Sequence, residues 1–130
     1  MRLLLLEDDV MIGETVLDLL RAEQYAVDWV KDGDAADTAL RTQQYDLVLL
    51  DLGVPRRDGL DVLRALRSDD RTRLIPIVVL TSSAEEQDLV RSYGLGANSY
   101  VRKPVDFTQF VEAVRQLGLY WLVINQAAPQ

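Results

Sequence analysis

Acidic, hydroxyl and amino side chains follow four short apolar runs of this sequence, directly or within two positions of the end of each run. The runs and their followers are Leu3–Leu6 before Glu7-Asp8-Asp9, Leu47–Leu50 before Asp51, Ile75–Leu80 before Thr81-Ser82-Ser83, and Ser99–Val101 before Arg102-Lys103-Pro104. Several carboxylates in one site repel each other unless a cation is present, and oxygen ligands without histidine favour Mg²⁺. A lysine and a hydroxyl opposite such an ion could hold a transferred phosphoryl group, whose charge spreads over three oxygens. Asp51 is the best candidate for a nucleophilic carboxylate, because it stands alone after a central apolar run.

The apolar runs are typical of strands, and a fifth run of this kind is Ala26–Val30. Three of the five are almost entirely apolar, as in strands buried on both faces of a parallel sheet. Apolar residues recur at helical spacing in five other segments: Ile12, Val16, Leu19 and Leu20; Ala36, Ala39 and Leu40; Leu60, Leu63, Ala65 and Leu66; Leu89, Val90 and Tyr93; and Phe107, Phe110, Val111, Val114 and Leu117. This alternation predicts one doubly wound α/β domain, a five-stranded parallel sheet with helices on both faces. Ligands of such sheets bind beyond the carboxyl ends of the strands, so the polar followers should converge on one edge.

The composition excludes several kinds of chemistry. The chain has 130 residues, enough for one domain with a full core, and it contains no Cys and no His. These absences exclude a disulfide framework, a thiolate or imidazole metal site, a cysteine nucleophile and a Ser-His-Asp triad. The 21 acidic against 14 basic residues give a formal charge of -7, which argues against nucleic acid as a direct partner. No apolar run approaches the roughly 20 residues needed to span a bilayer, so we expect no membrane segment and a cytoplasmic location.

The ordered set of strand-end residues resembles the receiver domain of two-component response regulators, of the single-domain, chemotaxis-receiver kind. The resemblance runs from residue 2 to about residue 118, and the matching residues are Glu7-Asp8, Asp51 within Asp51-Leu52-Gly53-Val54-Pro55, Asp58-Gly59, Thr81-Ser82, Tyr100 and Lys103-Pro104. It implies a flavodoxin-like three-layer sandwich of (βα)5 topology with strand order 2-1-3-4-5. It also implies a role in phosphorelay signal transduction, as a phosphoacceptor with self-catalysed phosphotransfer and autodephosphorylation rather than as a conventional enzyme.

The same resemblance assigns the acidic residues to a metal site and a phosphoryl acceptor. Asp51 would accept the phosphoryl group from a phosphohistidine on a sensor or hybrid histidine kinase, or on a phosphotransfer protein. Because the sequence has no histidine, that phosphohistidine must lie on another protein. Asp8 and Asp51 would bind Mg²⁺ directly and Glu7 through water, with the carbonyl of Gly53 as a further ligand.

Residues in or directly after the last two predicted strands would respond to the phosphoryl group. The resemblance implies that Thr81 hydrogen-bonds one phosphoryl oxygen and that Lys103 pairs with another. The peptide between Lys103 and Pro104 would be cis and would aim the lysine, a geometry otherwise rare in proteins. Tyr100 would be the switch residue that turns inward as Thr81 moves, which alters a protein-interaction surface.

Plainer interpretations exist for several of these residues. An acidic run before a helix could be a cap, and we expect Asp9 to be that cap while Glu7 and Asp8 belong to the metal site. Ser83 could cap the helix that follows it. Tyr100 could be a half-buried aromatic residue of an edge strand and nothing more.

Two other function classes compete with the receiver interpretation. A phosphatase of the haloacid dehalogenase kind needs a second Asp two residues after its Asp nucleophile, where this chain has Gly53. An inactive or engineered receiver scaffold would act only as a folded or binding module. A chimera of two receivers is a related hypothesis, because residues 1–67 resemble receivers of winged-helix transcription regulators and the rest resembles stand-alone receivers that serve hybrid or phytochrome-type kinases. A natural open reading frame for all 130 residues would exclude the chimera.

The end of the sequence is unusually apolar. We expect the receiver domain to span residues 1–122, with a tail at 123–130 and no output domain. Apolar residues keep helical spacing across Gly118, at Val114, Leu117, Trp121 and Ile124. An exposed apolar patch of this kind usually marks an interface, so a homodimer through the last helices is a further hypothesis.

Overall fold

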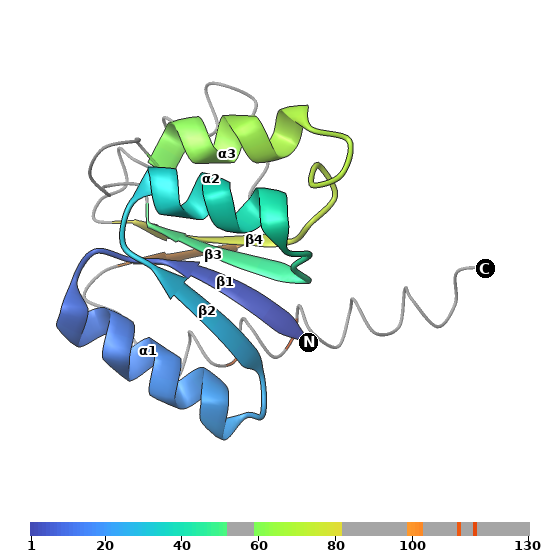
Figure 1. The fold of residues 1–130 in the computed structure, drawn as a ribbon. Coiled ribbons are helices and arrows are strands. Elements are labelled where there is room, and N and C mark those ends of the chain that lie inside the picture. The colour runs from blue at the N-terminus through green and yellow to red at the C-terminus, as the bar shows by residue number, and fades with distance from the viewer. Residues whose placement is uncertain (52–58, 82–98, 103–111, 113–115, 117–130) are drawn as a thin grey trace.

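A parallel sheet of five strands forms the centre of the fold, in the order β2-β1-β3-β4-β5 (Figure 1). The computed structural model describes residues 1–51, 59–81 and 99–102, together with Glu112 and Gln116. The strands are β1 (Arg2–Leu6), β2 (Ala26–Val30), β3 (Leu47–Asp51), β4 (Ile77–Thr81) and β5 (Ser99–Arg102). Every neighbouring pair is parallel. The predicted doubly wound α/β fold and its strand order are therefore confirmed.

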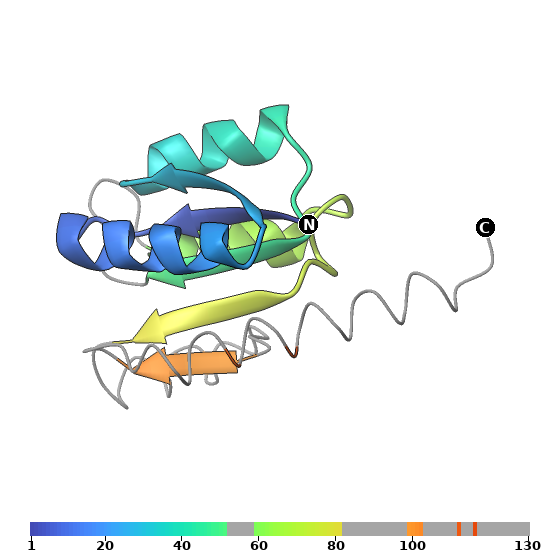
Figure 2. The ribbon, with the colours of Figure 1, turned by 90° about the horizontal axis from the view of Figure 1, so that it is seen from below.

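The helices α1 (Val10–Ala22), α2 (Gly33–Thr42) and α3 (Gly59–Ser68) cover this sheet. The first is capped as predicted, because Oδ1 of Asp9 accepts the Ile12 N–H at 3.1 Å, and Asp32 caps α2 in the same way. α2 and α3 lie together on one face of the sheet, and α1 covers the other face (Figure 1), where it runs in front of β1 and β3 when seen from below (Figure 2). None of the helices among these described residues is long and apolar enough to cross a bilayer. Of the two predicted helical segments after residue 82, only Glu112 and Gln116 are described, and both are helical; the continuation past residue 118 lies outside the described residues.

Alternate residues of the strands build two separate cores, one on each face of the sheet. Leu3 and Leu5 point to the α1 face, where they pack with Val16 and Leu20. The opposite core holds the intervening residues of β1, β3 and β4 and the apolar stripes of α2 and α3; its buried members are Leu4, Leu6, Ala36, Tyr45, Val48, Leu50, Val62, Leu63, Leu66, Ile77 and Val79. Because β1 and β3 are buried on both faces, their carboxyl ends are held firmly in place.

The fourth strand begins two residues later than the sequence pattern predicts. The predicted run started at Ile75, whereas β4 starts at Ile77. Proline has no N–H to donate to a ladder, so Pro76 offers only its carbonyl, which accepts the Val48 N–H at 3.0 Å. The N–H of Ile75 is used in the preceding turn, where it donates to the Thr72 carbonyl at 3.0 Å. The strand can therefore begin only after the proline.

A polar cluster joins three segments at the amino edge of the sheet. Arg2 donates to Oδ2 of Asp28 through Nε at 3.2 Å and through Nη2 at 2.9 Å, and the Tyr45 hydroxyl donates to the same oxygen at 2.6 Å. The hydrogen bond from Tyr45 has the largest effect on the pKa of Asp28, and the hydrogen bond from Arg2 has the next largest. Together they hold this pKa below its usual range. Burial, followed by the nearby Asp28 carboxylate, raises the pKa of Tyr45 to about 12. This cluster ties β1, β2 and the segment before β3 together.

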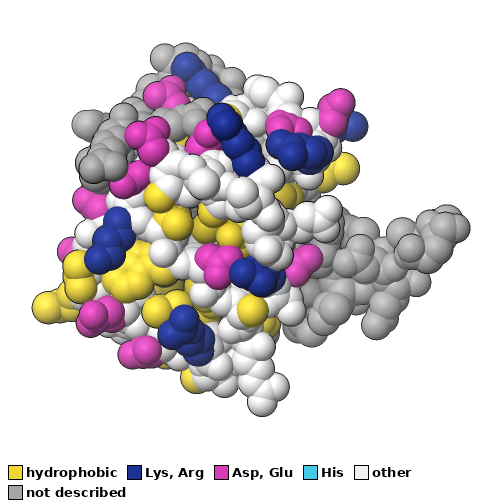
Figure 3. Space-filling model, in the orientation of Figure 1, with side chains coloured by type: hydrophobic (Ala, Val, Ile, Leu, Met, Phe, Trp, Pro, Cys, Tyr) yellow, Lys and Arg dark blue, Asp and Glu magenta, His cyan; other side chains and the backbone are white. Residues whose placement is uncertain are grey.

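Charges of both signs are interspersed on the face of the molecule shown in Figure 3. The formal charge of -7 is therefore not gathered into one acidic patch on that face.

Candidate metal centre at the carboxyl edge of the sheet

Acidic residues at the carboxyl ends of the neighbouring strands β1 and β3 lie at the same edge of the sheet. β1 and β3 pair directly, with Leu6 opposite Leu50. Glu7 follows Leu6, and Asp51 follows Leu50, so each lies one residue beyond that pair. The continuous apolar run of each strand ends at this point, and the acidic residue follows it directly. Parallel strands thus bring together residues that are far apart in the sequence.

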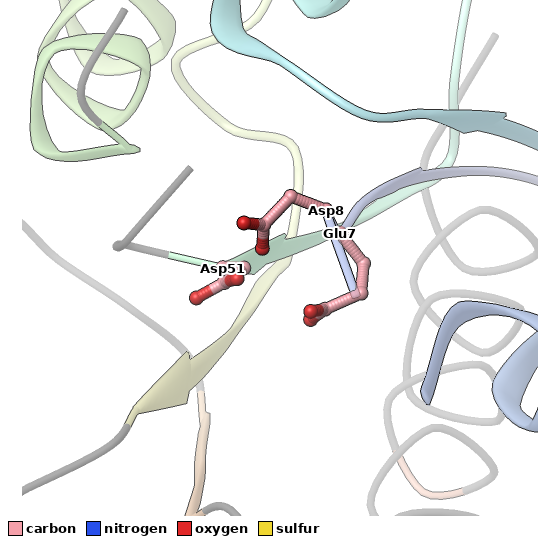
Figure 4. Close-up of side chains that lie close together, drawn as sticks. All are labelled: Glu7, Asp8 and Asp51. Atoms are coloured by element: carbon pink, nitrogen blue, oxygen red, sulfur yellow. The ribbon is translucent and has the colours of Figure 1, made fainter. Parts of the chain in front are cut away.

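Glu7, Asp8 and Asp51 form a compact carboxylate cluster (Figure 4). Each residue offers one oxygen, and these oxygens all lie within 4.8 Å of one another. Glu7 is fully buried, Asp51 is 2% exposed, and Asp8 is exposed. The cluster is therefore open on the side of Asp8 and closed on the side of the core. This arrangement confirms that these three predicted residues come together.

The donor set fits a hard divalent cation. At 4.8 Å, two carboxylate charges repel each other by about 3 kcal/mol with the effective dielectric constant of about 20 that suits such sites. A cation between them converts this repulsion into attraction. Carboxylates without nitrogen or sulfur ligands suit Mg²⁺, which keeps several waters and binds through one or two carboxylates and phosphate oxygens. The three residues could hold Mg²⁺ and leave coordination positions for a phosphoryl group.

The backbone of Glu7 is tied to β2 through both of its polar groups. Its N–H donates to the Val30 carbonyl at 3.1 Å, which extends the β1–β2 ladder by one bond. Its carbonyl accepts the indole Nε1–H of Trp29 at 2.8 Å. The Glu7 side chain also accepts the Asp9 N–H through Oε1, at 3.1 Å. Residues 7–9 are thus a defined turn between β1 and α1, in which Asp9 is the cap and Glu7 and Asp8 belong to the cluster.

The sequence patterns did not predict that Trp29 lies beside residues 7–9, which connect β1 to α1. The indole packs on α1 at Gly13, and a Cβ at Gly13 would lie 2.1 Å from Cζ2 of the ring. A glycine inside an otherwise regular helical pattern often has a packing reason, and this was the available signal. No pattern, however, shows which side chain fills the space.

The other predicted site residues are described only in part. Thr81 is the last residue of β4, one position beyond the pair of Leu80 with Asp51, and it is paired with Arg102 of β5. Tyr100 lies in β5 opposite Val79. The backbone thus places Thr81 at the same edge as the carboxylate cluster. The predicted ligand Gly53, the predicted phosphate-binding Lys103 and its cis bond to Pro104 lie outside the described residues.

Comparisons with known proteins all identify the same protein family. A family model described as the response regulator receiver domain matches residues 3–115. The response regulator protein PmrA of Pseudomonas aeruginosa is 44% identical over 117 residues, which cover 90% of this chain and 52% of PmrA. The chain therefore spans about half the length of that relative.

Solved structures with a similar fold include a bacteriophytochrome response regulator and the receiver domain of a sensor histidine kinase. The bacteriophytochrome response regulator RtBRR is 42% identical with a TM-score of 0.80, over 90% of this chain and 77% of RtBRR. The receiver domain of sensor histidine kinase PA1611 from Pseudomonas aeruginosa PAO1 is 30% identical with a TM-score of 0.78, over 90% of this chain and 97% of that one. That structure has a magnesium ion coordinated in its active-site cleft.

Proposed function

Because the chain belongs to the family of response regulator receiver domains, we propose that it accepts a phosphoryl group on Asp51 in a reaction that requires Mg²⁺. The observation that supports this most strongly is the cluster of Glu7, Asp8 and Asp51, whose oxygens lie within 4.8 Å of one another. Asp51 is the acceptor in this proposal because it ends a strand buried on both faces, with only 2% of its surface exposed. A nucleophile held in this way keeps a fixed direction of attack.

The proposed reaction is a direct transfer. A carboxylate oxygen of Asp51 attacks the phosphorus of a phosphohistidine, the P–N bond breaks, and the electron pair leaves with the imidazole nitrogen, which takes up a proton. The product on Asp51 is an acyl phosphate, which water later hydrolyses to the carboxylate and inorganic phosphate. Mg²⁺ held by Asp8 and Asp51, and by Glu7 through water, would neutralise the charge of the transferring group. Glu7 is fully buried, so its carboxyl group faces the site from the side of the core.

The proposal assigns the stabilising and switching roles to Thr81, Lys103 and Tyr100, and a further metal ligand to the carbonyl of Gly53. It is supported by the register that places Thr81 one residue beyond the pair of Leu80 with Asp51. When Thr81 binds the phosphoryl oxygen and Tyr100 turns inward, the fourth predicted helix and β5 would shift between two packings, and a partner surface would change with them.

Receiver domains take their phosphoryl group from histidine kinases or phosphotransfer proteins, and we propose a partner of this class here. A cytoplasmic location, typical of the family, is part of the same proposal. A homodimer through the last helices and the absence of nucleic-acid binding stay predictions.

An inactive or engineered scaffold, including a chimera, is the alternative. The matches to PmrA and to RtBRR each cover 90% of this chain, so neither relative is confined to one of the two halves that a chimera would join.

The test of the proposed function is phosphorylation by acetyl phosphate, followed by intact mass, with Mg²⁺ and then with excess EDTA. We expect the mass of one added phosphoryl group only with Mg²⁺. Mg²⁺ alone should also raise the unfolding free energy, by about 1.4 kcal/mol at ten times its dissociation constant. A protein that gains neither phosphate nor stability would be the inactive scaffold.

A further inference from the structure

The indole of Trp29 is held on three sides between β2, α1 and the end of β1. Its Nε1–H donates to the Glu7 carbonyl at 2.8 Å. Its benzene ring lies so close to α1 that a Cβ at Gly13 would be 2.1 to 2.8 Å from three ring atoms. The Lys31 ammonium lies over the ring, 5.1 Å from the ring centroid. A half-buried side chain with these contacts has one defined orientation.

The hydrogen bond from Trp29 replaces a bond that the sheet does not supply at this point. The register of β1 and β2 ends with Leu6 opposite Val30, and the Glu7 N–H continues it to the Val30 carbonyl. Beyond this bond the chain turns towards α1. A carbonyl in such a place needs a donor, and the indole N–H provides it.

The peptide that receives this bond joins two of the three acidic residues of the cluster, Glu7 and Asp8. Since a peptide unit is planar, a fixed direction for the Glu7 carbonyl also fixes the position of the Asp8 Cα. The hydrogen bond from Trp29 therefore acts on Glu7 and Asp8 together. Metal sites lose affinity when their ligands move by a fraction of an ångström, and residues that orient ligands affect binding strongly.

We propose that Trp29 is a positioning residue for the metal centre, which orients the Glu7–Asp8 peptide and so sets the affinity for Mg²⁺. This inference rests on the proposed function, because it takes the cluster to be a Mg²⁺ site. Trp29 contacts no phosphoryl group in this proposal, and it acts only through the turn. Its indole N–H should also respond when the cluster binds a cation.

The test compares Trp29→Phe with Tyr45→Phe, both measured against the wild type. Trp29→Phe keeps an aromatic ring and removes the donor to Glu7. Tyr45→Phe also removes one side-chain donor, but that donor lies in the segment before β3 and its acceptor, Asp28, is not a member of the carboxylate cluster. Mg²⁺ affinity is measured by isothermal titration calorimetry on folded protein. We expect about tenfold weaker binding for Trp29→Phe and unchanged binding for Tyr45→Phe.

The acetyl phosphate reaction separates positioning from a general structural defect. At saturating Mg²⁺ the Trp29→Phe protein should be phosphorylated at a rate close to that of the wild type, because only affinity is changed. If Trp29→Phe does not fold, the Trp29 indole N–H signal of the wild-type protein in ¹⁵N NMR, distinguished from the Trp121 signal by a Trp121→Phe variant, gives the answer. That signal should shift along the Mg²⁺ titration with the calorimetric dissociation constant.

Two results would overturn the inference alone. One is wild-type Mg²⁺ affinity in a folded Trp29→Phe protein, and the other is an indole N–H signal that does not move while Mg²⁺ binds. A wild-type protein that binds no Mg²⁺ would instead overturn the proposed function, and this inference with it.

Discussion

A methyl group at position 13 would test whether the indole of Trp29 lies on α1. In Gly13→Ala the new Cβ would lie 2.1, 2.5 and 2.8 Å from Cζ2, Cε2 and Cη2 of Trp29, where carbon atoms normally stay at least about 3.5 Å apart. Overpacking of this kind costs about 1–3 kcal/mol. A displaced ring also loses its bond to Glu7, about 1 kcal/mol, while alanine regains about 1 kcal/mol of helix propensity. The expected net loss is about 1–3 kcal/mol.

Urea unfolding followed by circular dichroism measures this loss, and a second variant identifies its cause. In a Trp29→Leu background the ring is gone, so Gly13→Ala should be neutral or should stabilise by up to about 1 kcal/mol. The non-additivity of the two substitutions then reports the contact itself. If Gly13→Ala were as stable as the wild type with Trp29 present, the placement of the indole against α1 would be refuted.

Two further predictions concern the amino edge of the sheet and the loop before β4. Tyr45→Phe should lower the unfolding free energy by about 1 kcal/mol at neutral pH. Tyr45 holds the pKa of Asp28 down, so in urea unfolding this loss should fade as the pH falls through that lowered value. The pKa of Tyr45 is raised to about 12, so the loss should also shrink from about pH 10 to 12, where the unfolded phenol ionises first; a pH-independent loss would contradict this. Arg67→Met removes the guanidinium that donates to the carbonyls of Arg73 at 2.7 Å and Ile75 at 2.9 Å. The substitution should lower the unfolding free energy by about 2 kcal/mol and speed amide exchange in the loop before β4. Unchanged amide exchange would contradict the idea that Arg67 holds this loop in place.

Local patterns predicted the sheet and the carboxylate cluster because both follow from short-range rules. Apolar runs such as Leu3–Leu6 identify strands, and the strand order, which the family resemblance implied, then decides which strand ends meet. Glu7, Asp8 and Asp51 come together for this reason, although Asp8 and Asp51 are far apart in the sequence. The start of β4 was wrong by two residues, since the effect of Pro76 on the ladder was not taken into account.

Contacts between side chains of different elements could not be predicted in the same way. The fit of Trp29 to Gly13 depends on the angle between α1 and β2, which no local pattern contains. The bond from Tyr45 to Asp28 likewise depends on how the segment before β3 meets β2. Such contacts arise from tertiary packing. They surround a site whose residues could be recognised in the sequence from their types and spacing.

The most direct test of the central claim is the identity of the phosphorylated residue. The wild type, Asp51→Asn and Asp70→Asn are incubated with acetyl phosphate and Mg²⁺ and compared by intact mass, with hydroxylamine to cleave any acyl phosphate. Asp70 is a matched control, because its carboxylate is 98% exposed in the loop before β4, away from the cluster. The wild type and Asp70→Asn should each gain one hydroxylamine-sensitive phosphoryl group, and folded Asp51→Asn should gain none. Labelling of folded Asp51→Asn at the wild-type level would show that Asp51 is not the acceptor.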